Sequence, residues 1–380
     1  MSDRSDTHPS AVLVSVDTGS AGYLDDLAEF QHLATSSGVQ VKNLLQAKRE
    51  RPDPKYFLGS GKVAELKQVM QSSEAKLALF SHDLSPSQQR NLEKFLECCV
   101  TDRTGLILQI FAQRAKSHEG KLQVELAQLE HLSTRLVRGW THLERQKGGI
   151  GVRGGPGETQ LELDRRMLRV RVKQLREKLA KLKQQRGMQR RSRKRSHVMT
   201  ISIVGYTNAG KSTLFNRLTS AQVLAADQLF ATLDTTSRKL YIPDCGQVVI
   251  SDTVGFIKHL PHALVEAFGA TLEEAVQADV LLHVVDMASA NRDEQIAAVN
   301  QVLQEIGADK VPQILVLNQI DRNGVTPAIE RNEYGKIDKV LVSAKTGAGF
   351  DLLMQALSEH YQAYQDFWTT PEAYQYQQSI

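Results

Sequence analysis

Two scarcities narrow the possibilities for this sequence of 380 residues: it has few cysteines and no long apolar run. Its three cysteines, Cys98, Cys99 and Cys245, match no metal-ligand spacing and no even set of disulfide partners. A reducing compartment is the simplest interpretation. The first ten residues are polar and charged, so we expect no signal peptide. Apolar runs such as residues 280–285 are far too short to cross a bilayer. We therefore expect a cytoplasmic protein without a membrane span.

Acidic residues are scarce in one long segment. Residues 165–195 hold fifteen lysines or arginines and a single acid, Glu177. The segment carries +14, and since the whole chain carries only +4, the remainder carries −10. Self-repulsion destabilises such a helix unless a polyanion neutralises it, so we expect contact with RNA, a solvated face being the alternative. The expected contact residues are Arg153, Arg190, Arg191, Arg193, Lys194 and Arg195. Because the segment contains no aromatic residue, the contact should be with phosphate and shape, not with stacked bases.

The chain is too long for one ordinary domain, and its hydrophobic content of 41% suits a globular protein with two or three cores. After a polar tail at 1–10, residues 11–112 alternate apolar runs with amphipathic stretches, which predicts an α/β domain. The predicted strands are 11–16, 39–45 and 77–80, and the predicted helices are 23–36, 62–71 and 87–98. Gly59-Ser60-Gly61-Lys62 opens the helix at 62–71. It is either an ordinary turn or a second site for a phosphate at a helix N-terminus.

Residues 113–197 follow a heptad repeat interrupted by glycines. Apolar side chains recur on alternating steps of four and three residues, which predicts two helices with an apolar seam. The seam residues are Leu122, Leu126, Leu129, Leu136, Trp140 and Leu143, then Leu168, Val172, Leu175, Leu179 and Leu182. Between the helices, residues 148–157 contain six glycines and one proline. Thr159 and Glu162 form a capping box, which predicts that the second helix starts there. We expect an antiparallel hairpin with a basic tip that cannot pack a core.

The stretch Gly205-Tyr206-Thr207-Asn208-Ala209-Gly210-Lys211-Ser212 reads G-x-x-x-x-G-K-S. It follows an apolar run at 201–204 and precedes a helical pattern that begins with Thr213, which is the setting of a phosphate-binding loop. The glycines let backbone amides approach a polyphosphate, and the helix N-terminus adds its dipole. Lys211 would reach the β- and γ-phosphates, and Ser212 would bind Mg²⁺. The alternative is a glycine turn without a ligand.

Three shorter motifs follow other apolar runs between 198 and 365, a region that predicts a doubly wound α/β domain. Its predicted strands are 201–204, 239–242, 248–251, 280–285, 314–317 and 340–342. In Asp252-Thr253-Val254-Gly255, the aspartate would bind Mg²⁺ and the Gly255 amide would sense the γ-phosphate. In Asn318-Gln319-Ile320-Asp321, the Asp321 carboxylate would accept two N–H bonds that guanine offers and adenine does not. Ser343-Ala344-Lys345 would close over the base. Together the motifs predict a GTPase that binds GTP or GDP with Mg²⁺.

In these motifs the chain resembles the HflX family, ribosome-associated GTPases of the Obg–HflX group. The most specific parts are Tyr56-Phe57-Leu58-Gly59-Ser60-Gly61-Lys62, Gly157-Glu158-Thr159-Gln160-Leu161-Glu162-Leu163-Asp164 and Asp252-Thr253-Val254-Gly255-Phe256. The resemblance implies an N-terminal α/β domain, a helical linker and a Ras-like P-loop G domain. We expect the G domain at 198–365 and a C-terminal tail at 366–380. It also implies GTP hydrolysis, binding to rRNA of the large (50S) ribosomal subunit, and a role in ribosome splitting or recovery under stress. We expect a monomer.

The same resemblance identifies a first switch. Residues 229–234 read Leu-Phe-Ala-Thr-Leu-Asp and are similar to that family segment, which would make Thr232 the metal and γ-phosphate sensor. Thr235 and Thr236 are close alternatives. The catalytic group would then comprise Lys211, Thr232 and Gly255, and the metal ligands Ser212, Thr232 and Asp252.

Four positions qualify this interpretation. Gln319 stands where the guanine motif usually has lysine, and its shorter, uncharged side chain predicts weaker nucleotide binding. The pair Gly154-Gly155 adds a glycine to the tip and leaves its register open. Phe256 stands where many small GTPases carry a water-orienting glutamine, so hydrolysis should be slow away from the ribosome. Asn208 is either a ligand of K⁺ beside the phosphates or a residue that tolerates a left-handed backbone.

Three other functions stay open at this point. The chain could be a GTPase of ribosome assembly or RNA modification, because a basic hairpin fits either. It could be an adenine-nucleotide enzyme such as a kinase, against which Asp321 argues. It could also be an RNA-binding scaffold that does not hydrolyse nucleotide.

Overall fold

The computed structural model describes residues 9–19, 22–138, 156–220, 229–230, 232–234, 236–243, 245–258 and 269–369. These residues divide into two compact units. Unit 1 comprises the chain up to residue 113 together with 124–177, and unit 2 comprises 114–123 together with the chain from 178 onward. Within the described ranges, no helix is long and apolar enough to cross a membrane.

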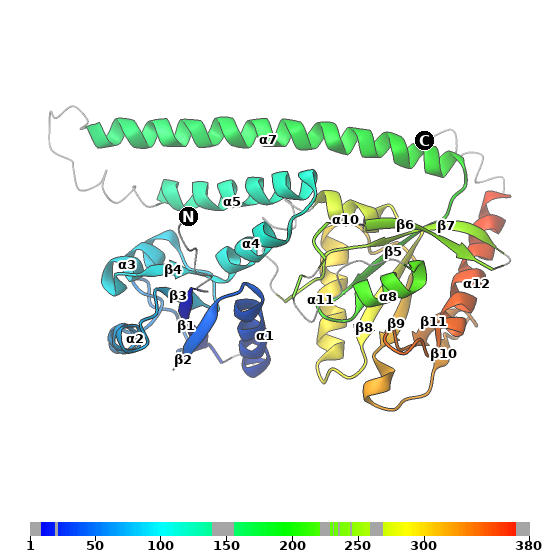
Figure 1. Cartoon of the computed structure of the whole chain (residues 1–380), viewed down its shortest axis with the longest axis horizontal. Coiled ribbons are helices and arrows are strands. Elements are labelled where there is room, and N and C mark those ends of the chain that lie inside the picture. Colours follow the sequence, from blue (N-terminus) through cyan, green and yellow to red (C-terminus); the bar gives the residue numbers. More distant parts are fainter. Residues whose placement is uncertain are drawn as a thin grey trace, which may run out of the picture. The chain divides into compact units, whose positions relative to one another are not determined.

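Unit 1 contains a four-stranded parallel sheet in the order β2-β1-β3-β4. Its elements are β1 (Ser10–Asp17), α1 (Tyr23–Ser36), β2 (Gln40–Lys48), α2 (Ser60–Ser72), β3 (Leu77–Phe80), α3 (Pro86–Leu96), β4 (Cys99–Thr101) and α4 (Arg103–Arg114). Val12, Val14 and Val16 of β1 face α2 and α3 in one apolar core. Helix α1 lies on the other side of the sheet (Figure 1). The predicted α/β fold of this region is confirmed.

The predictions for unit 1 were incomplete after residue 96. The helix predicted to reach residue 98 ends at Leu96, because Glu97 adopts a left-handed backbone with φ of 57° that the helix cannot continue through. After Cys98, the three residues Cys99–Thr101 form β4. This strand is too short to show an alternating pattern, and it was not predicted. Helix α4 directly follows it.

Two long helices, α5 (His118–Arg138) and α7 (Pro156–Arg195), form the predicted pair. Arg171 and Arg176 of α7 form ion pairs with Glu125 and Glu130 of α5, so the helices lie side by side there. On α7 the predicted seam is right: Leu175 is fully buried, and Leu168, Val172, Leu179 and Leu182 are half-buried. Residues 139–155 lie outside the described residues, and with them Trp140, Leu143, Arg153 and most of the glycine-rich stretch.

The predicted start of the second helix was wrong by three residues. Helix α7 begins at Pro156, so Thr159 lies inside the helix and is not its cap. Proline is favoured at the first helical position because its fixed φ suits the helix and its missing N–H would have no partner there.

Unit 2 contains a seven-stranded sheet in the order β10-β11-β9-β8-β5-β7-β6. Its strands are β5 (Thr200–Gly205), β6 (Thr236–Ile242), β7 (Gly246–Asp252), β8 (Val280–Asp286), β9 (Gln313–Asn318), β10 (Ala328–Arg331) and β11 (Ile337–Leu341). All six predicted strands are present, and β10 was not predicted. The sheet is parallel except at its edges, where β6 pairs antiparallel with β7 and β10 with β11.

Helices cover both faces of this sheet, as a doubly wound fold requires. They are α8 (Lys211–Thr219), α10 (Gly269–Val276), α11 (Arg292–Glu305) and α12 (Phe350–Trp368), with a short 3-10 turn η1 (Ile320–Arg322) after β9. Helices α8 and α12 share one core with the central strands, through Leu214, Phe215 and Leu353 among others. Helices α10 and α11 lie on the opposite face (Figure 1). The motifs predicted from the sequence therefore gather at the carboxyl edge of the sheet.

Candidate nucleotide-binding site

The loop between β5 and α8 has the geometry of a phosphate cradle. Gly205 has φ of 149°, and a Cβ there would lie 2.2 Å from the Val284 carbonyl oxygen. Gly210 has φ of 91°, and a Cβ there would lie 2.3 Å from the Asn318 side-chain nitrogen. No other residue type fits these two positions. With glycine there, the loop can turn so that its backbone amides lie at the carboxyl edge of the sheet. Thr213 follows in the first turn of α8.

Lys211, the first residue of α8, is buried, and its ammonium donates to the Tyr206 carbonyl oxygen at 2.7 Å. Burial lowers the pKa of Lys211 to about 8, and the neighbouring Asp252 carboxylate opposes that shift. An anion seated in the loop would stabilise the charged ammonium further. The side chain is thus held where a phosphate would meet it.

Three oxygen ligands predicted for Mg²⁺ lie together, although they come from three separate segments. The Ser212 hydroxyl donates to Asp252 Oδ2 at 2.8 Å, and the hydroxyl oxygens of Ser212 and Thr232 are 2.6 Å apart. Asp252 is fully buried, and burial raises its pKa while the Lys211 ammonium opposes the shift. Its other oxygen, Oδ1, is buried and accepts no hydrogen bond from the described residues. Hard oxygen donors around an unsatisfied carboxylate fit Mg²⁺.

The segment after Asp252 passes directly beneath the phosphate loop. The Thr207 amide donates to the Phe256 carbonyl oxygen at 2.7 Å, and the Phe256 amide donates to the Gly205 carbonyl oxygen at 3.1 Å. A Cβ at residue 255 would lie 2.8 Å from Thr207 Cγ2, so the chain needs Gly255 here. The ring of Phe256 is completely buried, and Thr253 and Val254 are buried beside it. The Phe256 ring is buried and has no hydrogen-bonding atom, so it cannot orient an attacking water.

The residues predicted to bind guanine are connected to the phosphate loop. The Asn318 side chain is buried, donates to the Ala209 carbonyl oxygen at 2.9 Å and accepts from the Ala344 amide at 2.9 Å. Asp321 accepts a hydrogen bond from the Ser343 hydroxyl at 2.6 Å, which orients its carboxylate. Asn318 thus braces the phosphate loop against the segment from Ser343 to Lys345.

Gln319 and Asn208 meet at the open side of this arrangement. Both have left-handed backbones, with φ of 65° and 64°. The Gln319 side-chain nitrogen donates to the Asn208 carbonyl oxygen at 3.2 Å, and its oxygen accepts from Arg322 at 2.9 Å. The glutamine side chain therefore contacts the phosphate loop despite being shorter than lysine.

Arg217 of α8 is a residue of this site that the motifs did not reveal. Its guanidinium donates to the carbonyl oxygens of Lys345 and Thr346 at 3.0 and 2.8 Å. A Cβ at residue 347 would lie 2.1 Å from the same guanidinium, so Gly347 makes room for it. Arg217 holds the base-side loop closed, and its only sequence signal is an arginine on the helix that follows the phosphate loop.

The basic residues of α7 fall into two groups. Arg171, Arg176, Lys183 and Arg186 form ion pairs with acidic residues of their own units. Others are exposed and were not singled out from the sequence: Arg166, Arg169, Lys173, Lys178 and Lys181. The backbone at 190–195 belongs to α7, but the side chains of Arg190, Arg191, Arg193, Lys194 and Arg195 lie outside the described part of the structure.

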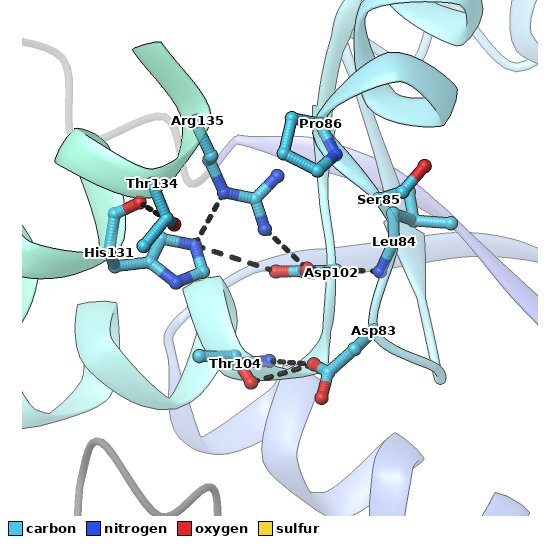
Figure 2. Close-up of a pocket in the computed structure, with 9 residues that line it drawn as sticks. All are labelled: Asp83, Leu84, Ser85, Pro86, Asp102, Thr104, His131, Thr134 and Arg135. Carbon is cyan, nitrogen blue, oxygen red and sulfur yellow. Dashed lines mark hydrogen bonds and ion pairs between the residues drawn. The ribbon is translucent and has the colours of Figure 1, made fainter. Parts of the chain in front are cut away.

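A second polar cluster lies where β3 and β4 of unit 1 end (Figure 2). Asp102 accepts hydrogen bonds from Arg135 of α5 and from the Leu84 and Gly105 amides. His131 accepts from Arg135 at 2.7 Å, and burial lowers the pKa of this histidine. These contacts attach α5 to the sheet of unit 1. The turn at Gly59–Lys62, expected to be either an ordinary turn or a phosphate site, is not part of this cluster. Gly59 precedes α2, and Lys62 is paired with Glu65 at 2.9 Å.

The order of the motifs along this sheet places the chain among the P-loop GTPases, enzymes that hydrolyse GTP. Three family models match it: GTP-binding GTPase N-terminal at residues 24–112, GTP-binding GTPase Middle Region at 114–193, and 50S ribosome-binding GTPase at 200–319. The GTPase HflX of Escherichia coli (strain K12) is 56% identical over 360 residues, which cover 94% of this chain and 84% of that relative. The GTPase HflX of Magnetococcus marinus is 49% identical over 87% of this chain and 76% of the relative. The chain belongs to the HflX family of GTPases.

A solved structure agrees with this assignment. The crystal structure of SsGBP in complex with GDP is 25% identical, has a TM-score of 0.51, and covers 94% of this chain and 99% of that one. The similarity extends over both units and not only over the nucleotide site. Binding and hydrolysis of GTP follow from membership of the HflX family of GTPases.

Proposed function

We propose that this GTPase binds the large ribosomal subunit in its GTP-bound form and acts in ribosome splitting or recovery under stress. The observation that carries the proposal is the row of exposed lysines and arginines on α7, which is unneutralised within the described residues and joined to a G domain. Such a surface binds a polyanion through phosphate contacts. The match of that G domain to the family model named 50S ribosome-binding GTPase supports the choice of polyanion.

The nucleotide site would work through residues that the fold already brings together. Ser212, Thr232 and Asp252 would hold Mg²⁺, which neutralises charge on the phosphates. Lys211 would contact the β- and γ-phosphates, and the Gly255 amide would contact the γ-phosphate. Asp321, oriented by Ser343, would accept the two N–H bonds of guanine. Thr232 would then report whether the γ-phosphate is present, which couples nucleotide state to subunit binding.

Co-sedimentation with isolated large subunits tests the proposal. Binding should be tight with a non-hydrolysable GTP analogue and weaker with GDP. Replacing Arg166, Arg169, Lys173, Lys178 and Lys181 by glutamine should weaken binding. The slope of log affinity against log salt concentration should become shallower by about 0.7–0.9 for each phosphate group that is no longer neutralised. The matched control changes Arg171 and Arg176 to glutamine, because Glu125 and Glu130 already neutralise these two charges. Equal binding with analogue and GDP, or equal salt slopes for both variants, would contradict the proposal.

A comparison with free RNA separates this function from the alternative. If the protein binds precursor rRNA or tRNA as tightly as it binds mature large subunits, a role in assembly or RNA modification becomes the better interpretation.

A further inference from the structure

The N-terminus of α5 is bound by a residue of the first switch. The Asp234 carboxylate accepts hydrogen bonds from the Lys116 amide at 2.8 Å, from the Ser117 amide at 2.7 Å and from the Ser117 hydroxyl. The Gly120 amide donates to the Ser117 hydroxyl oxygen at 2.8 Å. All of these residues belong to unit 2. Ser117 is thus the capping residue of α5, and Asp234, 117 positions further along the chain, holds that cap in place. Its negative charge suits the helix dipole.

Gly120 fits this contact in a way that no other residue could. A Cβ at position 120 would lie 2.1 Å from Asp234 Oδ1. Inside a helix, glycine ordinarily destabilises relative to alanine. A glycine in the first turn of α5 is therefore explained by the space that the Asp234 carboxylate needs.

The same segment is held on its other side at the metal ligands. Thr232 is two residues before Asp234, and its hydroxyl lies 2.6 Å from that of Ser212. Leu233 between them is buried. Two extended peptide units span only about 7 Å, so Thr232 and Asp234 cannot move independently over longer distances.

We propose that Asp234 is a positioning residue of the GTP-bound state, because its bonds to the N-terminus of α5 hold Thr232 where it meets Mg²⁺ and the γ-phosphate. The proposal rests on the role given to Thr232 above. Since coupling between two sites is reciprocal, GTP with Mg²⁺ also stabilises the first turn of α5. That helix continues into unit 1, where Arg135 and His131 attach it to Asp102 (Figure 2). Helix α5 is the first helix of the linker, so the nucleotide state reaches the linker at this first turn.

Nucleotide affinities of three variants test the proposal. Asp234→Ala should weaken binding of a GTP analogue with Mg²⁺ about fivefold to tenfold, whereas GDP affinity should stay within about twofold of the native value. Asp234→Asn, which keeps one acceptor oxygen, should restore part of the loss. Gly120→Ala should act like Asp234→Ala, although the change alone favours a helix. The matched control is Gly187→Ala, because a Cβ at that glycine of α7 meets no atom within 4 Å.

The double variant Gly120→Ala with Asp234→Ala should be no worse than either single variant, since both remove the same interaction. Additive losses would overturn the proposal. The proposal would also be overturned if Thr232→Ala loses affinity for the GTP analogue but Asp234→Ala leaves the ratio of analogue affinity to GDP affinity unchanged. If Thr232→Ala also leaves the ratio unchanged, the switch assignment itself is wrong, and the two failures are thereby distinguished.

Hydrogen exchange gives a readout independent of affinity. Amides of residues 116–120 should exchange more slowly with the GTP analogue and Mg²⁺ than with GDP in the native chain. In Asp234→Ala this difference should disappear. A difference of the same size in both proteins would overturn the proposal.

Discussion

Asn318 offers the sharpest test of how the nucleotide site is built. Its buried side chain joins the phosphate loop at Ala209 to the base-side loop at Ala344 by two hydrogen bonds of 2.9 Å. Asn318→Ala removes both hydrogen bonds at once. Each buried polar group left without a partner costs about 1–3 kcal/mol, so the loss at Ala209 and Ala344 should lower the free energy of unfolding by about 2–6 kcal/mol.

The effect of Asn318→Ala on nucleotide affinity should be smaller than its effect on stability and should be equal for GTP and GDP. Because Asn318 braces both loops, its removal affects nucleotide binding through the alignment of those loops. We expect GTP and GDP affinity to fall equally, by about tenfold, which corresponds to about 1.4 kcal/mol. Asn318→Asp should be worse, because a carboxylate oxygen would then face the Ala209 carbonyl oxygen while the Ala344 bond persists.

Chemical denaturation and titration with fluorescent GTP and GDP measure the two quantities separately. A variant of a residue that only contacts the phosphates should behave differently, because its affinity should fall while its stability is kept. An Asn318→Ala variant with native stability and native affinity would refute the bracing role, and a loss confined to GTP would refute the expected equality.

Three further predictions concern base choice, monovalent ions and pH. Asp321→Asn should shift preference from guanine to xanthine nucleotides, measured by competition, and unchanged selectivity would argue against Asp321 as the base ligand. If Asn208 binds K⁺, GTP turnover should be faster in potassium chloride than in sodium or caesium chloride, and this difference should vanish in Asn208→Ala. Equal rates in the three salts would mean that Asn208 serves only to adopt the left-handed backbone of the loop. Burial lowers the pKa of His283 to about 4, so the free energy of unfolding should fall as pH drops from about 6.5 toward 4, by roughly 1.4 kcal/mol per unit, because the unfolded chain binds the proton first. Denaturation of His283→Phe at several pH values should show a flatter slope over this range.

The nucleotide site could be predicted from local sequence because each motif is short and directly follows a buried strand. Gly205 and Asp252 lie at strand ends, and Lys211 begins the helix that follows the first of them. Parallel strands bring those ends to one edge of the sheet. The start of α7 was missed because the capping box at Thr159 competes with Pro156, a better first residue. The edge strands β4 and β10 are too short to show a periodic pattern.

Other features depend on contacts between distant segments, and no local pattern announces them. Asp234 reads as an ordinary polar residue until it is seen against Ser117 and Gly120. Arg217 likewise shows no signal beyond its place on α8. Heptad spacing predicted the apolar seam of α7, but which of its bases are paired and which are exposed depends on the acids of neighbouring elements, such as Glu125.

The rate of GTP hydrolysis, measured for the isolated chain and again with purified large ribosomal subunits, tests the central claim most directly. The ring of Phe256 is buried at the position from which a side chain would orient the attacking water. Hydrolysis by the isolated chain should therefore be slow, and saturating subunits should accelerate it through ordering of the switch or a group supplied by the subunit. Fast hydrolysis by the isolated chain, unchanged by large subunits, would contradict the account.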